Sequence, residues 1–365
     1  MSAVQFACPK WMEFGPCGGV RPDGRCEVAE HACVFLDRPL PTWTAAAAEP
    51  DAAEPDAAEP AAAEPGAAGR IPSAERMLAR LAEAAAGRAP MIVSDLPAVA
   101  LDADSLAATS RVVAGHADAV LLGDSPAHRV QLPPTLRAQI VQSNGLAAWT
   151  GLNARDRNRV ALEAELAGLA LIGVAGVHAV TGDHTDSGAR PDAKPVFDLD
   201  SMRIAAAARA VGHLLSVAEA PASPPIAERP HRLIEKLRAG ADLCFVDHCG
   251  GADAVARFAR RVAELADASG LASPPLIACV PAVIDRGSAE LLASFPALVL
   301  PEGYLEGLLA ASDVRAAGIA ATAELARRML EIPGVVGVNL SGGAGDGAEL
   351  AFAEALAELG DRIRA

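Results

Sequence analysis

Residues 146–181 read LAAWTGLNARDRNRVALEAELAGLALIGVAGVHAVT, and this stretch decides the fold. Two short apolar runs, Leu146–Thr150 and Gly176–Thr181, flank the amphipathic segment Asp156–Ile172. Short apolar runs bounded by turn residues predict buried strands, and the longer segment between them has the apolar spacing of a helix. A strand, a helix and a second strand in this order form the repeating unit of a parallel sheet.

The same alternation continues on both sides of this stretch. The eight predicted strands are Met91–Ser94, Ala119–Leu122, Leu146–Thr150, Gly176–Thr181, His213–Ala218, Asp242–Val246, Pro275–Val280 and Val335–Leu340. Helical patterns separate them, for example in Ala252–Ala268 and Ala316–Glu331. Eight strand–helix units predict an α/β fold, a TIM (β/α)8 barrel over residues 73–365. An open doubly wound sheet is the alternative, but it requires a glycine-rich turn after the first strand, and Ser94-Asp95-Leu96-Pro97 is not one.

The first 72 residues have a different character. Four of the seven cysteines lie in residues 1–38, namely Cys8, Cys17, Cys26 and Cys33. Residues 46–65 then repeat x-Ala-Ala-Glu-Pro four times, and a proline at every fifth position prevents a continuous helix. Nothing in this repeat can form a core. We therefore predict a small cysteine-rich module (residues 1–38) and an extended low-complexity linker (residues 39–72) that tethers it to the barrel.

The composition narrows the classes of function. A net charge of −15 argues against nucleic acid as the main partner. The start of the sequence lacks a basic segment followed by an apolar run, so we expect no secretory signal. The most apolar stretch, Gly168–Thr181, is too short to span a membrane. We therefore expect a cytoplasmic protein, whose cysteines serve as thiols or metal ligands rather than disulfides. We also expect a homo-oligomer.

Polar residues gather at the carboxyl ends of the predicted strands, where the active sites of such barrels lie. They are Asp95, Asp124, Asn153, Asp183, Glu219 and the pair Asp247-His248. An aspartate in such a position can also simply cap the helix that follows. Their concentration at one rim favours a site.

Two segments resemble the methylenetetrahydrofolate reductase family. The first is Arg155-Asp156-Arg157-Asn158-Arg159, which leads into Glu165-Leu166-Ala167-Gly168, and the second is Thr181-Gly182-Asp183-His184. Their order and spacing are similar to the third and fourth units of that barrel, and weaker similarity extends over residues 73–360. The N-terminal segments Cys8-Pro9-Lys10, Gly15-Pro16-Cys17-Gly18-Gly19 and Gly24-Arg25-Cys26 resemble the cysteine-rich accessory module found with some bacterial members.

This resemblance implies an activity. The family reduces 5,10-methylenetetrahydrofolate to 5-methyltetrahydrofolate in one-carbon and methionine metabolism, with FAD carrying a hydride from NAD(P)H. Opening of the imidazolidine ring requires a proton donor for a poor nitrogen leaving group. Asp95 matches the family's catalytic glutamate at the end of the first strand. Asp183 matches an aspartate near the flavin ring, where a carboxylate tunes the reduced flavin and stabilises a cationic folate intermediate.

The resemblance also assigns cofactor and substrate contacts. The cofactor-binding set is Asn153, Arg157, Asn158, Asp183, His184 and Lys236; Lys236 aligns with a contact to a cofactor phosphate. Arg157 and Asn158 are predicted to begin the helix after the third strand, which suits contacts with a phosphate or a ring edge. Asp247 aligns with a substrate-binding glutamine. The sequence departs from the family here and at Gly151-Leu152-Asn153-Ala154.

These departures leave alternatives open: a divergent barrel that acts on another one-carbon or methyl substrate, or a non-catalytic partner subunit of a reductase. The cysteine module has its own alternatives. Four thiolates suit a [4Fe–4S] cluster or a structural zinc ion. The third alternative is that the module is a docking peptide without metal. The resemblance favours the cluster, which would relay electrons from an electron-donor protein.

Overall fold

A computed structural model of the chain describes residues 7–44, 69–124, 128–295 and 298–365. Most of the predicted linker, residues 45–68, therefore lies outside the described residues. The strands form one closed parallel barrel in sequence order. They are β1 (Met91–Asp95), β2 (Ala119–Leu122), β3 (Ala148–Asn153), β4 (Gly176–Val180), β5 (Leu215–Glu219), β6 (Leu243–Val246), β7 (Leu276–Pro281) and β8 (Val335–Ser341). The predicted TIM barrel is confirmed.

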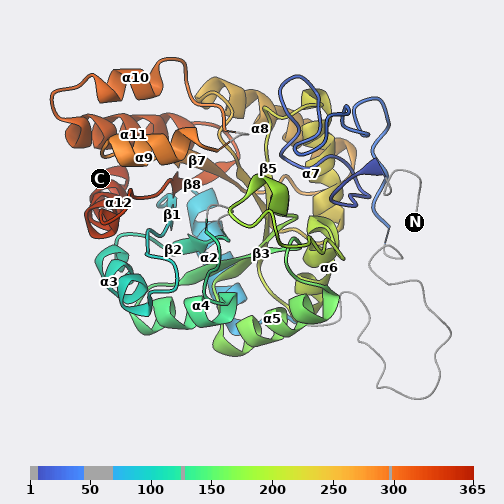
Figure 1. Cartoon of the computed structure of the whole chain (residues 1–365), viewed down its shortest axis with the longest axis horizontal. Coiled ribbons are helices and arrows are strands. Elements are labelled where there is room, and N and C mark those ends of the chain that lie inside the picture. The colour runs from blue at the N-terminus through green and yellow to red at the C-terminus, as the bar shows by residue number, and fades with distance from the viewer. Residues whose placement is uncertain (1–6, 45–68, 125–127, 296–297) are drawn as a thin grey trace.

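Helices surround the barrel, as Figure 1 shows in a view along its axis. They are α2 (Pro72–Ala85), α3 (Ala103–Val113), α4 (Pro134–Ser143), α5 (Arg159–Ile172), α6 (Ser201–Val211), α7 (Arg229–Arg238), α8 (Ala252–Ala268), α9 (Arg286–Ala293), α10 (Tyr304–Leu309), α11 (Val314–Leu330) and α12 (Glu349–Arg364). Short 3-10 helices occupy residues Thr185–Ser187 and Ile226–Glu228. Among the described residues, no helix has the length and hydropathy needed to cross a bilayer.

Helix α5 begins at Arg159, three residues later than predicted. The Asn158 side chain accepts a hydrogen bond from Ala161 N, which makes it the N-cap. The Asp198 carboxylate accepts a second bond, from Arg159 N. At the other end Gly173 adopts a φ of 69°, a left-handed conformation that glycine tolerates and that ends the helix. Arg157 and Asn158 thus precede the helix rather than open it.

The core is built mainly from Ala, Leu and Val side chains because aromatic residues make up only 3% of the chain. Inside the barrel, Trp149 packs edge-on against Phe245 at 5.4 Å and donates a hydrogen bond to Ser216 Oγ. Helix α2 closes the end of the barrel where the strands begin, with Met77 and Leu81 packed against the strand starts. The N-terminal segment lies at the opposite end of the barrel, where the strands finish.

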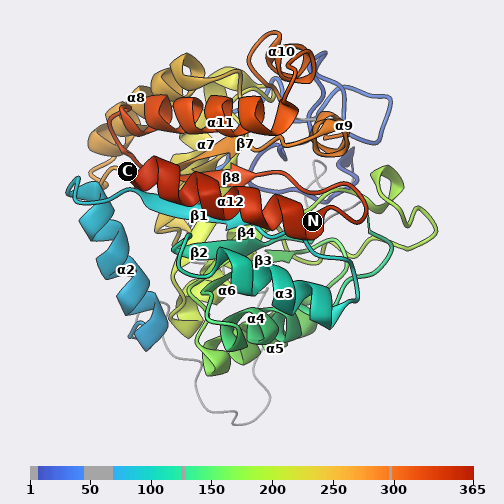
Figure 2. The same cartoon turned by 90° about the vertical axis from the view of Figure 1, so that its left-hand side faces the viewer.

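Residues 7–44, here called the N-terminal module, lie beside α7 in Figure 1 and at the end of the barrel opposite α2 in Figure 2. This module includes residues 39–44, which the sequence assigns to the linker. Trp43 is buried there and packs edge-on against Phe14 at 4.9 Å. The module therefore extends at least to this tryptophan.

Candidate functional site

A cavity of about 560 Å³ lies at the carboxyl ends of the strands. The ends of β2 to β6, the end of β8 and the N-terminal module line this space, which we call the mouth cavity. It falls in the size range of pockets for small organic ligands. Of the residues predicted at the rim, Asp124, Asn153, Asp183, Glu219, Asp247 and His248 line it.

Two carboxyl groups, Asp95 and Asp183, act on a third, Asp247, at the mouth. Burial, together with the nearby charges of Asp95 and Asp183, raises the pKa of Asp247 to about 6. Burial also raises the pKa of Asp183, against the opposing effect of Lys10. Asp247 is thus the carboxyl group closest to titrating near neutral pH, which suits a proton donor.

Asp95 is the last residue of β1, where burial raises the pKa of its side chain. Strand β8 and the residue after it hold this carboxylate: Asn339 Nδ2 donates to it at 3.2 Å and Gly342 N at 3.0 Å. Both bonds lower its pKa again. These contacts fix the orientation of the group that the sequence predicts as the acid.

Asn153 is the last residue of β3, and its side chain is engaged by its neighbours. Its Nδ2 donates to Asp124 at 2.7 Å, and its Oδ1 accepts a bond from Arg155 N at 3.0 Å. The Asp124 carboxylate also forms ion pairs with Arg157 at 2.8 Å and with Arg137 at 3.3 Å. One carboxylate after β2 therefore positions an amide and two guanidinium groups.

Glu219 ends β5, and its carboxylate lies in a buried ionic network. Its carboxylate contacts Arg229 at 3.1 Å and Lys236 at 2.7 Å, and all three side chains are at most 6% exposed. Lys236 also donates to Ala218 O. Burial would raise the pKa of Glu219, but Lys236, Arg229 and the nearby Arg232 hold it below its ordinary value.

The N-terminal module contributes side chains to the mouth cavity. Lys10 is 4% exposed; it pairs with Glu27 and donates a hydrogen bond to Gly182 O at 2.9 Å. Burial would lower the pKa of Lys10, but the negative charges of Cys17, Glu27 and Asp183 raise it. Glu27 in turn accepts a bond from His184 N at 3.0 Å. A lysine and a glutamate of the module thus hold the loop that carries Asp183.

Further hydrogen bonds fasten the module to α7 and to the loop before it. They join Arg229 Nη2 to Cys17 O (2.9 Å), Arg232 Nη1 to Phe14 O (2.8 Å), Trp43 N to Glu235 Oε2 (2.6 Å) and Ser223 Oγ to Gly18 O. The guanidinium groups of Arg229 and Arg232 are buried. Because the same arginines line the mouth cavity, the network around Glu219 connects the module to the site.

The four cysteines of the module line one small cavity, together with Lys10, Glu27 and apolar side chains. None of them forms a disulfide. Burial, together with the charges of Cys17, Cys8 and Cys26, raises the pKa of Cys33 to about 11. Within the described residues, no group of three or more His, Cys, Asp or Glu side chains is arranged to hold a single metal ion. Cys17 lines both this cavity and the mouth cavity.

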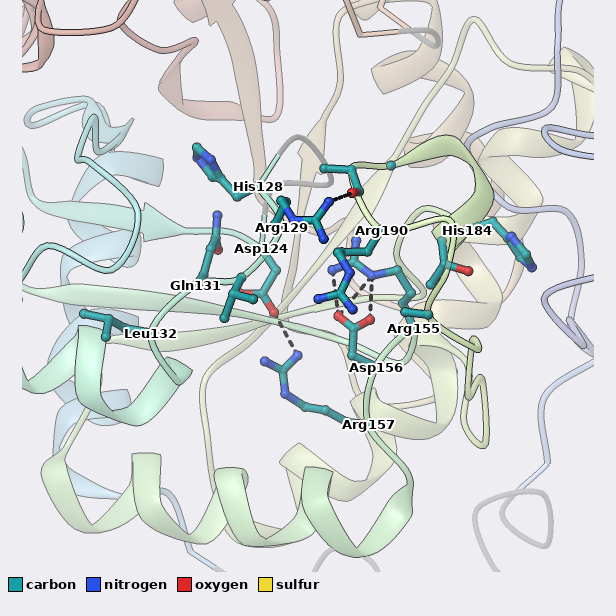
Figure 3. Close-up of a pocket in the computed structure, with 15 residues that line it drawn as sticks. Asp124, His128, Arg129, Gln131, Leu132, Arg155, Asp156, Arg157, His184 and Arg190 are labelled. Atoms are coloured by element: carbon teal, nitrogen blue, oxygen red, sulfur yellow. Dashed lines mark hydrogen bonds and ion pairs between the residues drawn. The ribbon is translucent and has the colours of Figure 1, made fainter.

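The residues predicted to bind a flavin are divided between two places. Asn153, Asp183 and Lys236 line the mouth cavity, while Arg157 and His184 line a second, smaller cavity between the loops after β2, β3 and β4 (Figure 3). The Asn158 side chain lines neither, because it caps α5. The two cations expected near phosphates are already paired, Lys236 with Glu219 and Arg157 with Asp124. The charges of these two cations are therefore balanced by carboxylates of the protein, and FAD stays a prediction.

Sequence reasoning missed several residues of the site. Lys10 and Glu27 lie next to the predicted cysteine ligands, yet nothing local indicates that they enter the barrel mouth. Arg229 and Arg232 precede the predicted Lys236 by seven and four residues, the spacing of one helix face. Three cations on one helix face, next to a strand that ends in Glu219, could have predicted a buried ionic network.

No known family model matches this sequence, and neither does any curated protein. The fold is shared with solved structures. A protein from Clostridium thermocellum that binds two copies of 5-methyl-5,6,7,8-tetrahydrofolic acid is 12% identical, with a TM-score of 0.56, over 76% of this chain and 97% of that one. A tryptophan synthase from M. tuberculosis is 15% identical with a TM-score of 0.44, covering 78% of this chain and 98% of its own. A 2,3-dimethylmalate lyase is 14% identical with a TM-score of 0.43, covering 72% and 80%. At these identities the likeness concerns the fold.

Proposed function

We propose that this chain binds a reduced folate in the mouth cavity and converts 5,10-methylenetetrahydrofolate to 5-methyltetrahydrofolate. The observation that carries the proposal is that Asp183 and Asp247 line the mouth cavity, each with a raised pKa, while the charge of the buried Asp95 acts on Asp247. The resemblance of the Thr181-Gly182-Asp183-His184 segment to the reductase family agrees with it.

The chemistry of a reduced pterin explains why acids suit this site. Its pyrimidine edge presents an N–H and an amino group, two adjacent donors that a carboxylate can accept together. Protonation of the bridging nitrogen breaks one carbon–nitrogen bond and leaves an iminium cation. A hydride then adds to the methylene carbon and forms the methyl group. The protein must supply one proton and stabilise one transient positive charge, and neighbouring carboxyl groups can do both.

We assign these tasks to different acids. Asp247, with a pKa of about 6, is partly protonated near neutral pH and can donate the proton. Asp183 lies beside Lys10 and remains a candidate for stabilising the cation. The hydride comes from NAD(P)H, with FAD as the predicted carrier. The tetrahydrofolate-binding barrel from Clostridium thermocellum supports a reduced folate as the ligand class.

Binding of 5-methyltetrahydrofolate tests the proposal directly. We expect anaerobic calorimetry on the full-length chain to give a Kd of roughly 1–100 µM. We also expect 5,10-methylenetetrahydrofolate to be consumed when NAD(P)H is supplied, with and without added FAD. Absence of binding by both folates would overturn the proposal. Binding without turnover under every donor would leave a folate-binding partner subunit instead.

We further propose that the N-terminal module holds a [4Fe–4S] cluster. Its four thiols line one cavity, and their mutual repulsion as thiolates would be relieved by a cationic centre. A zinc ion, with bonds of about 2.3 Å, would require the four sulfurs to lie within about 4 Å of one another. A cluster holds its ligands farther apart than a single zinc ion does and therefore does not require this tetrahedral arrangement. When bound, a cluster supplies one-electron transfer, and an electron-donor protein would be its partner.

Substitution of Cys8 or Cys33 by serine is expected to remove bound iron and the broad visible absorbance of a cluster from anaerobically purified protein. The control is Cys279→Ser, because Cys279 lies outside the cysteine cavity. Equal iron in all three variants would contradict the assignment. One zinc per chain with no visible absorbance would replace the cluster by a structural zinc ion.

A further inference from the structure

A buried histidine lies deeper in the mouth cavity than the acids at the strand ends. His178 is the third residue of β4; it is 7% exposed and lines the cavity. Its partners on the neighbouring strands are Gly151 on β3 and Ser216 on β5. The ring packs edge-on against Phe245 at a centroid distance of 5.0 Å. Gly151 has no side chain and also lines the cavity, which leaves space for a ligand beside the ring.

A chain of buried hydrogen bonds fixes one side of this ring. Trp149 Nε1 donates to Ser216 Oγ at 2.9 Å, and His178 Nδ1 lies 2.8 Å from the same oxygen. The serine has one proton, which can go to Nδ1 or to Val177 O at 3.3 Å. The contact with Nδ1 has the usual length of a hydrogen bond, whereas the contact with Val177 O is longer. We therefore assign the serine proton to the bond with Nδ1, which makes Nδ1 an acceptor.

The other ring nitrogen is available to a ligand. A neutral imidazole carries a single proton, so an accepting Nδ1 places this proton on Nε2. Burial and the charge of Lys236 lower the pKa of His178 to about 3, so the ring is neutral at physiological pH. Nε2 makes no hydrogen bond within the described residues and still has solvent-accessible surface. Because His178 lines the mouth cavity, its Nε2–H donor faces this space.

We propose that His178 is a specificity residue of the mouth cavity, where its Nε2–H donates a hydrogen bond to a ring carbonyl of the bound heterocycle. The direction of this bond is fixed, because the bonds from Trp149 to Ser216 and from Ser216 to His178 set the tautomer. A carbonyl oxygen satisfies the donor. An amino group at the same place would bring two donors together and leave one unpaired in a desolvated site. His178 therefore selects the oxo form of a ligand over its amino form.

This inference rests on the proposed folate function and deepens it. Two heterocycles of the proposed reaction carry a suitable carbonyl group. The pterin of a folate has one on its pyrimidine ring, and the isoalloxazine of a flavin has two. A pair of folates that differ only in this part of the ring, measured beside a flavin, distinguishes the two sources.

The test is anaerobic calorimetry on the full-length chain with 5-methyltetrahydrofolate and its 4-amino-4-deoxy analogue. The quantity compared is the ratio of the two affinities, because other effects of the amino group on the ring are shared by all variants. His178→Asn keeps an amide near the position of Nδ1 and has nothing at Nε2. We expect its oxo-to-amino ratio to be roughly 10- to 100-fold lower than that of wild type. His178→Gln places an amide near Nε2 and should keep most of the affinity for the oxo form.

His213→Asn is the matched control. His213 is also buried, but its Nε2 donates to Leu166 O at 2.8 Å, outside the mouth cavity. This variant should keep the wild-type ratio. A second measurement needs no variant: nitrogen NMR of histidine-labelled wild type should show His178 as the Nε2–H tautomer, without titration between about pH 5 and 8. The Nδ1–H tautomer would overturn the inference.

The outcomes separate this inference from the proposed function. If wild type and His178→Asn have the same oxo-to-amino ratio and bind FAD equally well, the assignment to His178 is wrong and folate binding stands. If the ratio is constant while His178→Asn alone loses roughly tenfold in affinity for FAD, the carbonyl belongs to the flavin. If wild type binds neither folate, the proposed function fails, and the FAD comparison alone decides the role of His178. Absence of FAD binding as well would overturn both.

Discussion

Replacement of Glu219 by glutamine is expected to lower the free energy of unfolding by about 3–5 kcal/mol at neutral pH. The carboxylate is 1% exposed and contacts Arg229 and Lys236 inside the protein. Without it, Arg229 and Lys236 would lose their carboxylate partner in the protein interior, next to the buried Arg232. Because Arg229 also holds Cys17 O, the module should detach from the mouth before the barrel unfolds. Urea denaturation, with limited proteolysis of the module, measures both effects.

The pH dependence of this effect has a definite sign. The pKa of Glu219 is lower in the folded chain than its ordinary value of 4.5. Its contribution to stability is therefore complete above that value and disappears as the pH falls through the folded-state pKa. The difference between wild type and Glu219→Gln should be largest at neutral pH and shrink in acid.

Glu358 offers a matched control, since it also bridges two arginines, Arg315 and Arg362. Its side chain is 33% exposed, and surface pairs contribute little. We expect Glu358→Gln to cost less than about 1 kcal/mol. Equal effects of the two substitutions would show that the Glu219 network does not hold the mouth together.

Replacement of Asp247 by asparagine is expected to slow folate reduction by roughly 10²- to 10⁴-fold, the usual contribution of a general acid. Product binding should change far less, because an amide still offers a hydrogen-bond acceptor. In the wild type the rate should fall as the pH rises through about 6, where the carboxyl group loses its proton. Steady-state rates over a range of pH, with direct measurement of the Kd, separate the two effects.

The same substitution should make the protein more stable at alkaline pH. The pKa of Asp247 rises from an ordinary value of 3.8 to about 6 because of burial and the charges of Asp95 and Asp183. A raised pKa means that the folded state favours the protonated form, so stability falls as the pH rises through 6. Asparagine carries no charge and should recover up to about 3 kcal/mol at pH 8 and almost nothing at pH 4.

Two further variants decide which carboxyl group is the acid. Asp267→Asn, on an exposed turn of α8, should change neither rate nor stability. Asp95→Asn tests the position that the resemblance assigns as the proton donor. If Asp95→Asn removes the activity and Asp247→Asn does not, the acid is Asp95 and the assignment to Asp247 is wrong.

Local sequence patterns predict much of the barrel. Strand β2 and helix α8 have the predicted ends, because a short run of apolar residues or a regular helical stripe is itself a local signal. Strand β3 runs three residues further than predicted, to Asn153. Gly151 interrupts the apolar pattern there. A Cβ at this position would crowd Leu122 O, which explains why the strand continues through a glycine.

The sequence alone determined that eight strands alternate with helices and that Asp95, Asp183 and Asp247 follow or end strands. Parallel strands then bring these residues to one rim. Only the tertiary structure decided that the N-terminal module lies over this rim, so that Lys10 and Glu27 contact the Gly182–His184 loop. It also decided that Lys236 is neutralised by Glu219. Such contacts join residues far apart along the chain, and their free energy depends on burial and charge at the meeting point, which no local pattern of residues encodes.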